Sequence, residues 1–433
     1  MKRQYTFIFL LILSIQFAAA QFTLDGEFKP RTEYRNGFGS IIPDAADPGF
    51  AIATRLRLNA GYEFDSFKFY MSLQDVMVWG ENRQIKPEDS NNSFSVFQAW
   101  ADIKLGEGFS TKLGRQQLVY DDQRILGGLD WAMQARNHDA GLLRYKKGGF
   151  MLDAAFAFNQ DFTATTGNPS GFQSIGTAYN TSGFFSYKTM QFLYLKQKWD
   201  AFSASALLMN NGFQNFTGDP AVADGVSNLL TLGTHLNYKK GSFGAAFNGY
   251  LQSGERQNSV DVSGAYLLGL DLSYKVSNGV TLGLGAEIIS GNDAGTADQT
   301  EAFFPLYGTN HKFNGFMDYF YVGNHANSVG LTDIHASAKF ALGKTSSLLV
   351  KVLNFSGEQE LASGEKSLGT EVDLVFAKKF KGYGLAIGYS QMFASDGMYE
   401  LKGVTEADAA GSQNWAWVQL TMKPKFLNTA PKE

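Results

Sequence analysis

The chain has 433 residues, with 37 Lys+Arg against 41 Asp+Glu and a formal net charge of −4 at pH 7. This mildly acidic balance argues against nucleic acid as a partner, and a sequence without cysteine excludes disulfides and a lipidated cysteine. The chain contains 47 Gly, 14% aromatic residues and only 9 Pro. Because its composition does not shift along its length, the sequence predicts one continuous architecture rather than several domains.

The N-terminus predicts a secretory signal peptide over residues 1–20. Two basic residues precede a short apolar run, and Ala18 to Ala20 offer the small side chains of a cleavage site. An uncleaved anchor helix would need a longer uninterrupted apolar run. We therefore expect export, cleavage near Ala20 and a mature barrel domain over 21–433.

The first predicted element after the signal peptide is a two-faced strand. Its segment LDGEFKPRTEYR, residues 24–35, carries six charges, all at odd positions, and the even positions are uncharged. Alternation with period two predicts a strand. An uncharged face toward lipid and a charged face toward a wet lumen would explain it.

The same alternation recurs to the end of the chain, and helical spacing is nowhere sustained. The predicted strands cover 22–35, 50–64, 67–79, 94–105, 109–119, 140–147, 150–160, 184–197, 200–211, 228–240, 242–253, 263–277, 279–290, 331–342, 346–356, 368–380, 383–395 and 413–423.

Strand length and loop rhythm indicate a membrane barrel. A soluble strand usually has about five or six residues, whereas a tilted strand that crosses a bilayer needs about 9–11, and most of these runs are at least that long. Short turns alternate with long polar connections such as 120–139 and 291–330, as in outer-membrane barrels with short periplasmic turns. A soluble β-sandwich or propeller would also alternate, but no blade-length repeat is present.

We therefore predict an all-β protein, a transmembrane antiparallel up-and-down β-barrel of about 18 strands in the bacterial outer membrane. The sheet must close, because an open edge would leave backbone groups unsatisfied in hydrocarbon. Segment 291–330 holds eight Phe or Tyr residues. We expect so aromatic a segment to fold against the barrel mouth or over it and to narrow the pore.

Signals for catalysis or metal binding are weak. The five His residues show no metal-ligand spacing, and nothing in the sequence pairs His235 or His335 with a serine, as a barrel lipase would require. We predict no enzyme activity, no cofactor and no metal.

Arginine is unevenly distributed along the chain. Of the ten arginines after residue 20, nine lie between Arg31 and Arg144. Strand parity directs five of them into the lumen on one wall: Arg31, Arg35, Arg55, Arg57 and Arg144. The planar guanidinium suits carboxylate or phosphate, which predicts a pathway for acidic solutes. The alternative is pairing with lumen acids, and the two interpretations can coexist. The candidate acids are Asp25, Glu27, Glu33, Glu63, Asp75 and Asp102.

Arg115 does not fit this scheme. It shares parity with Leu113 and would point toward lipid, where an Arg costs about 2–4 kcal/mol at mid-depth. Either it lies at the outer rim, or a bulge near Gly114 turns it inward.

The segment LGRQQLVYDDQRILGGLDWAMQARNHDAG, residues 113–141, closely resembles the signature of the alginate export family of outer-membrane barrels. The stretch YGTNHKFNGFMDYF, residues 307–320, and the pair Arg55 and Arg57 also resemble that family. The resemblance implies an 18-stranded barrel with a basic lumen for a polyanionic uronic-acid polymer. By position it implies pathway residues Arg115, Asp121, Asp122, Arg124 and Arg136, and loop or constriction residues Asp130, Trp131, Asp139, His311 and Asp318. The alternative for these loop residues is purely structural packing at the mouth.

The function we expect is a porin or channel for small or polymeric anionic solutes, with alginate-like export or diffusion as one form. The alternatives are a general non-specific diffusion porin and a barrel whose long loops have an enzymatic or adhesive role. The expected partners are outer-membrane lipid, an anionic saccharide or other acidic solute, and a periplasmic export partner.

Overall fold

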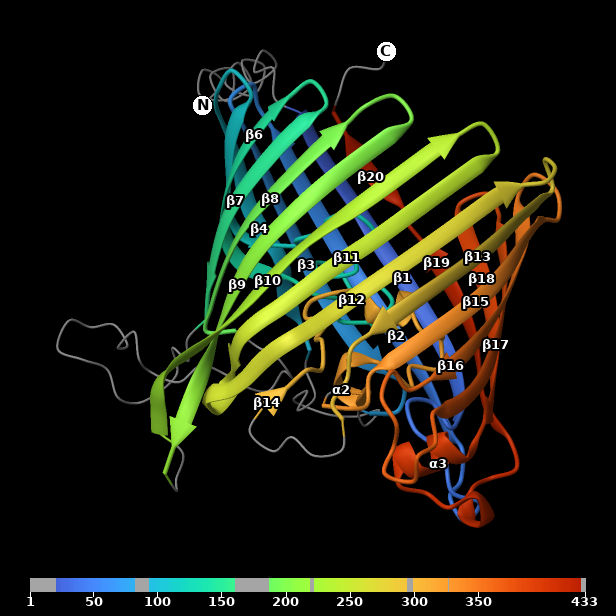
Figure 1. The fold of residues 1–433 in the computed structure, drawn as a ribbon. Coiled ribbons are helices and arrows are strands. Elements are labelled where there is room, and N and C mark those ends of the chain that lie inside the picture. The colour runs from blue at the N-terminus through green and yellow to red at the C-terminus, as the bar shows by residue number, and fades with distance from the viewer. Residues whose placement is uncertain are drawn as a thin grey trace, which may run out of the picture.

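The computed structural model describes residues 21–81, 93–159, 187–218, 222–293, 299–325 and 327–429. Within these ranges, eighteen strands form a closed antiparallel barrel (Figure 1), which confirms the predicted fold. Neighbours in sequence pair around the ring, and β1 pairs with β19 to close it. The predicted signal peptide lies outside the described residues, and its cleavage stays a prediction.

The barrel strands are β1 (Gln21–Asn36), β2 (Gly49–Glu63), β3 (Phe67–Val78), β4 (Ser95–Gly106), β5 (Phe109–Gln116), β6 (His138–Lys147), β7 (Phe150–Phe158), β8 (Thr189–Lys198), β9 (Phe202–Thr217), β10 (Val222–Lys240), β11 (Phe243–Arg256), β12 (Val260–Lys275), β13 (Val280–Ile289), β15 (Leu331–Ala341), β16 (Ser346–Ser356), β17 (Ser367–Lys379), β18 (Tyr383–Ala394) and β19 (Gln413–Met422). Two short strands pair alongside, β14 (Gln299–Thr300) with β12 and β20 (Lys425–Asn428) with β1. The helical pieces are α2 (Val322–His325), α3 (Asp396–Lys402) and the 3-10 turns Gln257–Ser259, Asn310–Lys312 and Glu406–Asp408.

Each predicted strand is present, and the differences lie at strand ends. β5 ends at Gln116, three residues before its predicted end, because the chain there leaves the wall and turns into the lumen. β9 runs past its predicted end at residue 211, β10 begins before its predicted start at residue 228, and the two form a hairpin that projects past the rim (Figure 1). Within the described ranges no helix is long and apolar enough to cross a membrane.

The outer face of the barrel is apolar and the inner face is polar, as β13 illustrates. Leu282, Leu284 and Ile288 are exposed on the outside, whereas Glu287 on the opposite face is buried. A lipid-facing surface explains exposed leucines on a regular strand. Because the lumen holds folded loop segments, many inward polar side chains are buried against them.

Aromatic rings gather at the end of the barrel that carries the short turns. Ring pairs lie beside several of these turns with centroids 4.6 to 6.2 Å apart, namely Phe109–Tyr145, Trp199–Phe202, Tyr238–Phe243 and Phe380–Tyr383. Such a girdle is typical of the membrane–water interface. Because outer-membrane barrels have short periplasmic turns, we assign the short turns to the periplasmic surface and the long connections to the outside.

Two long connections fold into the lumen at the outer end. We name residues 117–137, between β5 and β6, the crossing segment, and residues 299–325, between β13 and β15, the mouth segment. Figure 1 shows α2 and β14 of the mouth segment at the end opposite the short turns. Their hydrophobic residues form much of the buried core: Leu118, Ile125, Leu126, Phe303, Phe304, Leu306, Tyr307, Met317, Tyr319 and Phe320. The aromatic segment therefore folds inward at the mouth, as its composition predicted.

Candidate solute pathway

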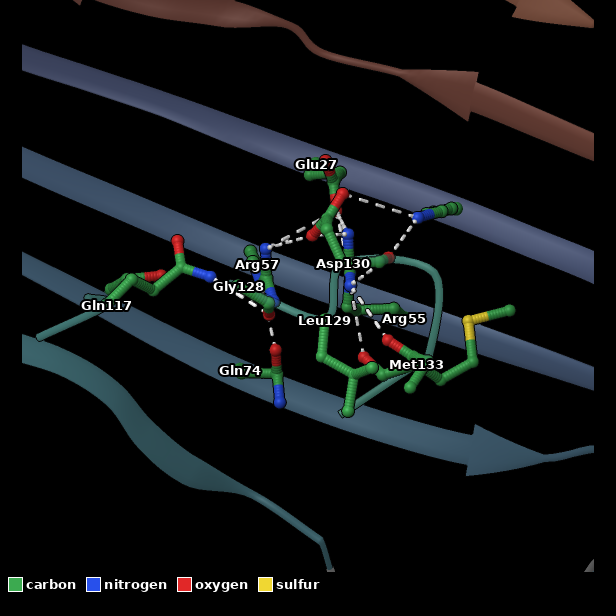
Figure 2. Close-up of polar contacts among 12 residues, drawn as sticks. Glu27, Arg55, Arg57, Gln74, Gln117, Gly128, Leu129, Asp130 and Met133 are labelled. Carbon is green, nitrogen blue, oxygen red and sulfur yellow. Dashed lines mark hydrogen bonds and ion pairs between the residues drawn. The ribbon is translucent and has the colours of Figure 1, made fainter. Parts of the chain in front are cut away.

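One end of the crossing segment binds basic side chains on β1 and β2. Asp130 Oδ1 lies 2.9 Å from Arg55 Nη2 and 3.3 Å from Arg57 Nη1, and its Oδ2 lies 3.6 Å from Lys29 Nζ. Glu27 accepts a 2.7 Å hydrogen bond from Arg55 Nε (Figure 2). Burial alone would raise the pKa of Asp130, but the neighbouring positive charges outweigh burial and hold that pKa below its usual range.

A second group on β1 extends this cluster toward the mouth. Glu33 accepts hydrogen bonds of 2.7 Å from Arg31 Nε and from Arg35 Nη2, and one of 3.1 Å from Trp415 Nε1. Arg31 also donates to the backbone carbonyl of Trp131 at 2.8 Å, and its guanidinium lies 4.1 Å from the centre of the indole ring. We call Lys29, Arg31, Arg35, Arg55 and Arg57 the basic cluster.

Basic side chains outnumber acids at this wall. With Lys423, which lies 3.2 Å from Glu27, six basic side chains contact three carboxylates, those of Glu27, Glu33 and Asp130. Exposure then separates roles within the cluster. The side chain of Arg55 is 0% exposed and that of Arg57 is 10% exposed, whereas that of Arg35 is 45% exposed. Arg55 therefore braces the crossing segment, and Arg35 faces the water.

A cavity of about 690 Å³ lies between residues 129–134 and the wall formed by β1, β2 and β3. Its lining includes Arg31, Arg35 and Trp131, together with His311 and Asp318 of the mouth segment. The cavity is therefore the place where Arg35, the exposed member of the basic cluster in this lining, lies near residues of both folded segments.

An aromatic stack fixes the two segments against each other beside this cavity. The His311 ring lies parallel to Trp131, with centroids 4.5 Å apart, and Trp417 meets Trp131 edge-on at 4.9 Å. His311 Nδ1 lies 2.9 Å from Asp318 Oδ1. Four of the five residues predicted for the loop or constriction, Asp130, Trp131, His311 and Asp318, thus come together.

The other end of the crossing segment binds the far wall. Asp121 accepts hydrogen bonds from Tyr194 Oη at 2.7 Å and Lys196 Nζ at 2.9 Å, on β8, and Asp122 accepts one from Asn248 Nδ2 at 2.6 Å, on β11. Since Asp130 binds β1 and β2, this segment bridges two walls of the lumen. Asp121 and Asp122 are bracing acids rather than part of the basic cluster.

Arg124 and Arg136 join the crossing segment to the mouth segment. Arg124 is 1% exposed and forms a two-point ion pair with Glu287 on β13, with Nε–Oε2 at 2.9 Å and Nη2–Oε1 at 2.5 Å. It also donates to Asn310 at 2.9 Å, and Arg136 donates to the carbonyl of Gly308 at 3.1 Å. Neither reaches the basic cluster, so the expectation that both line the pathway beside it is corrected: burial leaves Arg124 no free face for a solute.

Arg115 lies on the outer face of the barrel. It keeps the parity of Leu113, with no register shift at Gly114, and pairs with Asp139 through two contacts of 2.8 Å at the outer end of β5 and β6. The rim alternative is therefore correct and the bulge is wrong, so neither Arg115 nor Asp139 faces the lumen.

Arg144 is inward but separate from the basic cluster. It pairs with Asp153 through contacts of 2.7 and 2.6 Å, and Tyr120 donates to the same carboxylate at 2.7 Å. The expectation of a single patch that includes Arg144 is thus corrected, because β6 lies too far around the wall for its side chain to reach β1.

Sequence reasoning missed Lys29 and Glu287 as site residues. Both lie on polar faces of predicted strands, and Glu287 is the only charge within β13. A lone charge on an inward face was a usable signal, but its partner Arg124 lies 163 residues away, beyond any local pattern.

Comparisons with known proteins show which family and which fold this chain shares. The model of the alginate export family matches residues 21–412. OccAB4 of Acinetobacter baumannii is similar in structure, with TM-score 0.62 and 13% identity over 95% of this chain and 99% of that one. The outer membrane protein opdK of Pseudomonas aeruginosa gives TM-score 0.62 and 10% identity over 94% and 99%.

OpdO of Pseudomonas aeruginosa gives TM-score 0.60 and 12% identity over 94% of this chain and 98% of that one. At such identities the likeness shows the fold alone. A search of curated proteins found no match. The barrel is that of an outer-membrane porin, and the chain belongs to the alginate export family.

Proposed function

We propose that this porin passes anionic solutes, and that acidic saccharides such as uronic-acid oligomers are its substrate class. The observation that carries the proposal is the excess of basic over acidic side chains at the wall that holds the basic cluster, where Arg35 is exposed in the lining of the 690 Å³ cavity beside Glu33. Guanidinium groups bind carboxylates in a planar, two-point geometry, and basic residues give pores their anion preference. Alginate-like export or diffusion is one form of this function.

The partly apolar lining of the cavity supports a saccharide over a small inorganic anion. Trp131 lines the cavity together with Arg31 and Arg35. His311 and Arg31 cover the faces of the Trp131 ring, so the apolar surface comes from lining residues such as Ala53, Val76 and Leu129. Beside the guanidinium of Arg35 this surface offers an apolar contact and a carboxylate partner, the two features that a uronic acid combines. Ligand sites commonly pair an apolar lining with a few placed polar groups.

A general diffusion porin is the second candidate, and the burial of Arg55 favours it. Arg55 is 0% exposed and fully paired, so part of the basic cluster serves to hold the crossing segment rather than to meet a solute. In that case the channel would show little selectivity, and uronates would pass without binding.

Planar-bilayer recordings of the purified protein distinguish these candidates. Under a salt gradient we expect a reversal potential that indicates anion preference, and we expect block of the current by uronic-acid oligomers. Arg35→Gln should weaken the block on the order of 3- to 5-fold, about 1 kcal/mol or less, since an exposed charge is well screened.

The matched control is Lys339→Gln. Lys339 lines a different cavity, of about 410 Å³, at the short-turn end of β15 and β16. The Lys339→Gln substitution removes the same charge without affecting the basic cluster, so the block should stay as in the wild type. Cation preference, or a current indifferent to uronates, would contradict the proposal and favour the general porin.

A further inference from the structure

Two buried carboxyl groups on β17 have no basic partner. Glu371 and Asp373 are both 0% exposed and point to the same face, two positions apart. Within the described part of the chain neither forms an ion pair, in contrast to Glu287, which pairs with Arg124. A buried and uncompensated carboxylate is costly, so this pair must be stabilised in another way.

The contacts of the pair indicate a shared proton. The two carboxyl groups lie on one face of β17, and each keeps one oxygen, Glu371 Oε2 and Asp373 Oδ2, without a hydrogen-bond partner among the described residues. Ser390 Oγ donates to Asp373 Oδ1 at 2.5 Å, and the backbone N–H of Met317 donates to Glu371 Oε1 at 2.9 Å. Ionised carboxylates only accept hydrogen bonds, so two neighbouring buried carboxyls with unpartnered oxygens and no cation are stabilised if they share one proton.

The surrounding charges are compatible with one proton and one negative charge. Lys351 of β16 pairs with Asp373 in register, and His311 and Tyr319 of the mouth segment are the other titratable groups that act on the pair. The facing residue of β18 is Ser390, which carries no charge. Lys351 favours one ionised carboxyl, whereas full burial opposes a second charge beside the first.

Glu371 also fixes the mouth segment. Gly315 has φ +88°, and a Cβ there would lie 2.5 Å from Glu371 Oε2, so the backbone of this turn sits directly on the carboxyl. The N–H of Met317 binds the same group, and the Met317 carbonyl accepts a 2.7 Å hydrogen bond from Gly39 N–H. The turn over residues 315–319 includes Asp318, which lines the 690 Å³ cavity.

We propose that Glu371 and Asp373 form a proton-binding site that holds the 315–319 turn across the channel mouth. With the shared proton bound, the turn stays docked and the passage is narrow. Loss of the proton places two negative charges in contact, and their repulsion in a buried setting releases the turn. The contact is present at low pH and lost as pH rises, so the channel should open on the alkaline side. This gate does not depend on which solute passes.

Single-channel conductance from about pH 5 to about pH 9 tests the gate, since buried carboxyls can titrate as high as about 8–9. We expect wild-type conductance to rise with pH. Glu371→Gln keeps an acceptor for Met317 and gives Asp373 a permanent donor, so it should stay narrow and lose the pH response. Asp373→Asn should behave alike. The control Glu63→Gln removes an exposed carboxylate on β2 and should keep the wild-type response.

Infrared spectroscopy reads the proton directly. At neutral pH the wild-type protein should show the C=O stretch of a protonated carboxylic acid, and this band should be absent from the Glu371→Gln protein. Wild-type protein without such a band, or with conductance constant across the range, overturns the proposal even if the variants fail to assemble. A pH response that persists undiminished in assembled Glu371→Gln protein overturns it as well.

Discussion

Asp130 holds a carboxylate against the basic cluster. It contacts Lys29, Arg55 and Arg57, yet its side chain is 58% exposed (Figure 2). Asp130→Asn keeps the size of the side chain, and the backbone carbonyl of residue 130 still binds Lys29 at 2.9 Å. We therefore expect the crossing segment to remain docked while the wall becomes more positive. The anion preference measured by reversal potential should increase, and uronate block should tighten a few-fold.

Asp139→Asn is the control for that experiment. It removes the same charge from a carboxylate of similar exposure, 50%, which pairs with Arg115 on the outer face. Selectivity should be unaffected in this protein. If both substitutions changed selectivity equally, the effect would come from net charge rather than from the basic cluster.

Arg124 tests how the folded segments are held. Arg124→Ala would leave Glu287 buried without its cation, and breaking a buried pair costs about 3–5 kcal/mol. We expect the crossing and mouth segments to become sensitive to protease while the barrel remains folded. Limited proteolysis with heat-modifiable gel migration reports both properties. The double variant Arg124→Met with Glu287→Leu should recover much of the protection, because two apolar groups leave no unpaired charge.

At the scale of elements, the two inward segments carry most of the unusual backbone in the described chain. Of ten non-glycine residues with positive φ, seven lie in them, including Leu129 at 49° and Leu306 at 38°. Each such residue costs of order 1–3 kcal/mol and persists only where its surroundings hold it. The contacts of Arg124, Asp130 and Glu371 supply that support and hold the two segments in one conformation.

Replacing 303–324 by a short Gly-Ser linker should widen the channel. β13 and β15 pair directly along ten residue pairs, from Val280↔Phe340 to Ile289↔Leu331, so the wall does not need the mouth segment. We expect higher single-channel conductance with the barrel still assembled. A matched control shortens the β9–β10 hairpin past residue 214, outside the rim, and should leave conductance nearly unchanged. Equal conductance in both proteins would mean that the mouth segment does not narrow the pore.

The sequence predicts the strands better than the inward-folding segments. Strands could be predicted because alternation is a local signal that lipid on one side and polar groups on the other impose on each strand. The inward folding of 117–137 could not be derived that way, since its contacts join Asp130 to β2 and Arg124 to β13. Parity correctly oriented Arg31, Arg35 and Arg55, but it could not tell an exposed guanidinium from a bracing one, because burial depends on what packs against it.

At the scale of the whole molecule, charge is distributed across the barrel. The basic cluster lies on β1 and β2, whereas the buried acids Glu287, Asp333, Glu371 and Asp373 lie on β13, β15 and β17. The two folded segments lie between these walls and bind both. A solute that enters the mouth therefore meets a basic wall on which Arg35 is exposed to water, and an acidic wall whose carboxyl groups are buried.

A pair of arginine substitutions tests which face of the barrel contacts lipid. Leu284 lies in the middle of β13 and is 58% exposed on the outer face, and Ser337 on β15 pairs with Gly283 on the inner face. Leu284→Arg would place a charge in hydrocarbon at a cost of about 2–4 kcal/mol near mid-depth. Ser337→Arg adds the same side chain to the water-filled lumen, where it can remain hydrated. We expect Leu284→Arg to lower the urea midpoint for unfolding in lipid and to reduce the fraction of protein that migrates fast without boiling, while Ser337→Arg changes both little. If the two proteins lost stability equally, the outer face of this barrel would not be its lipid face.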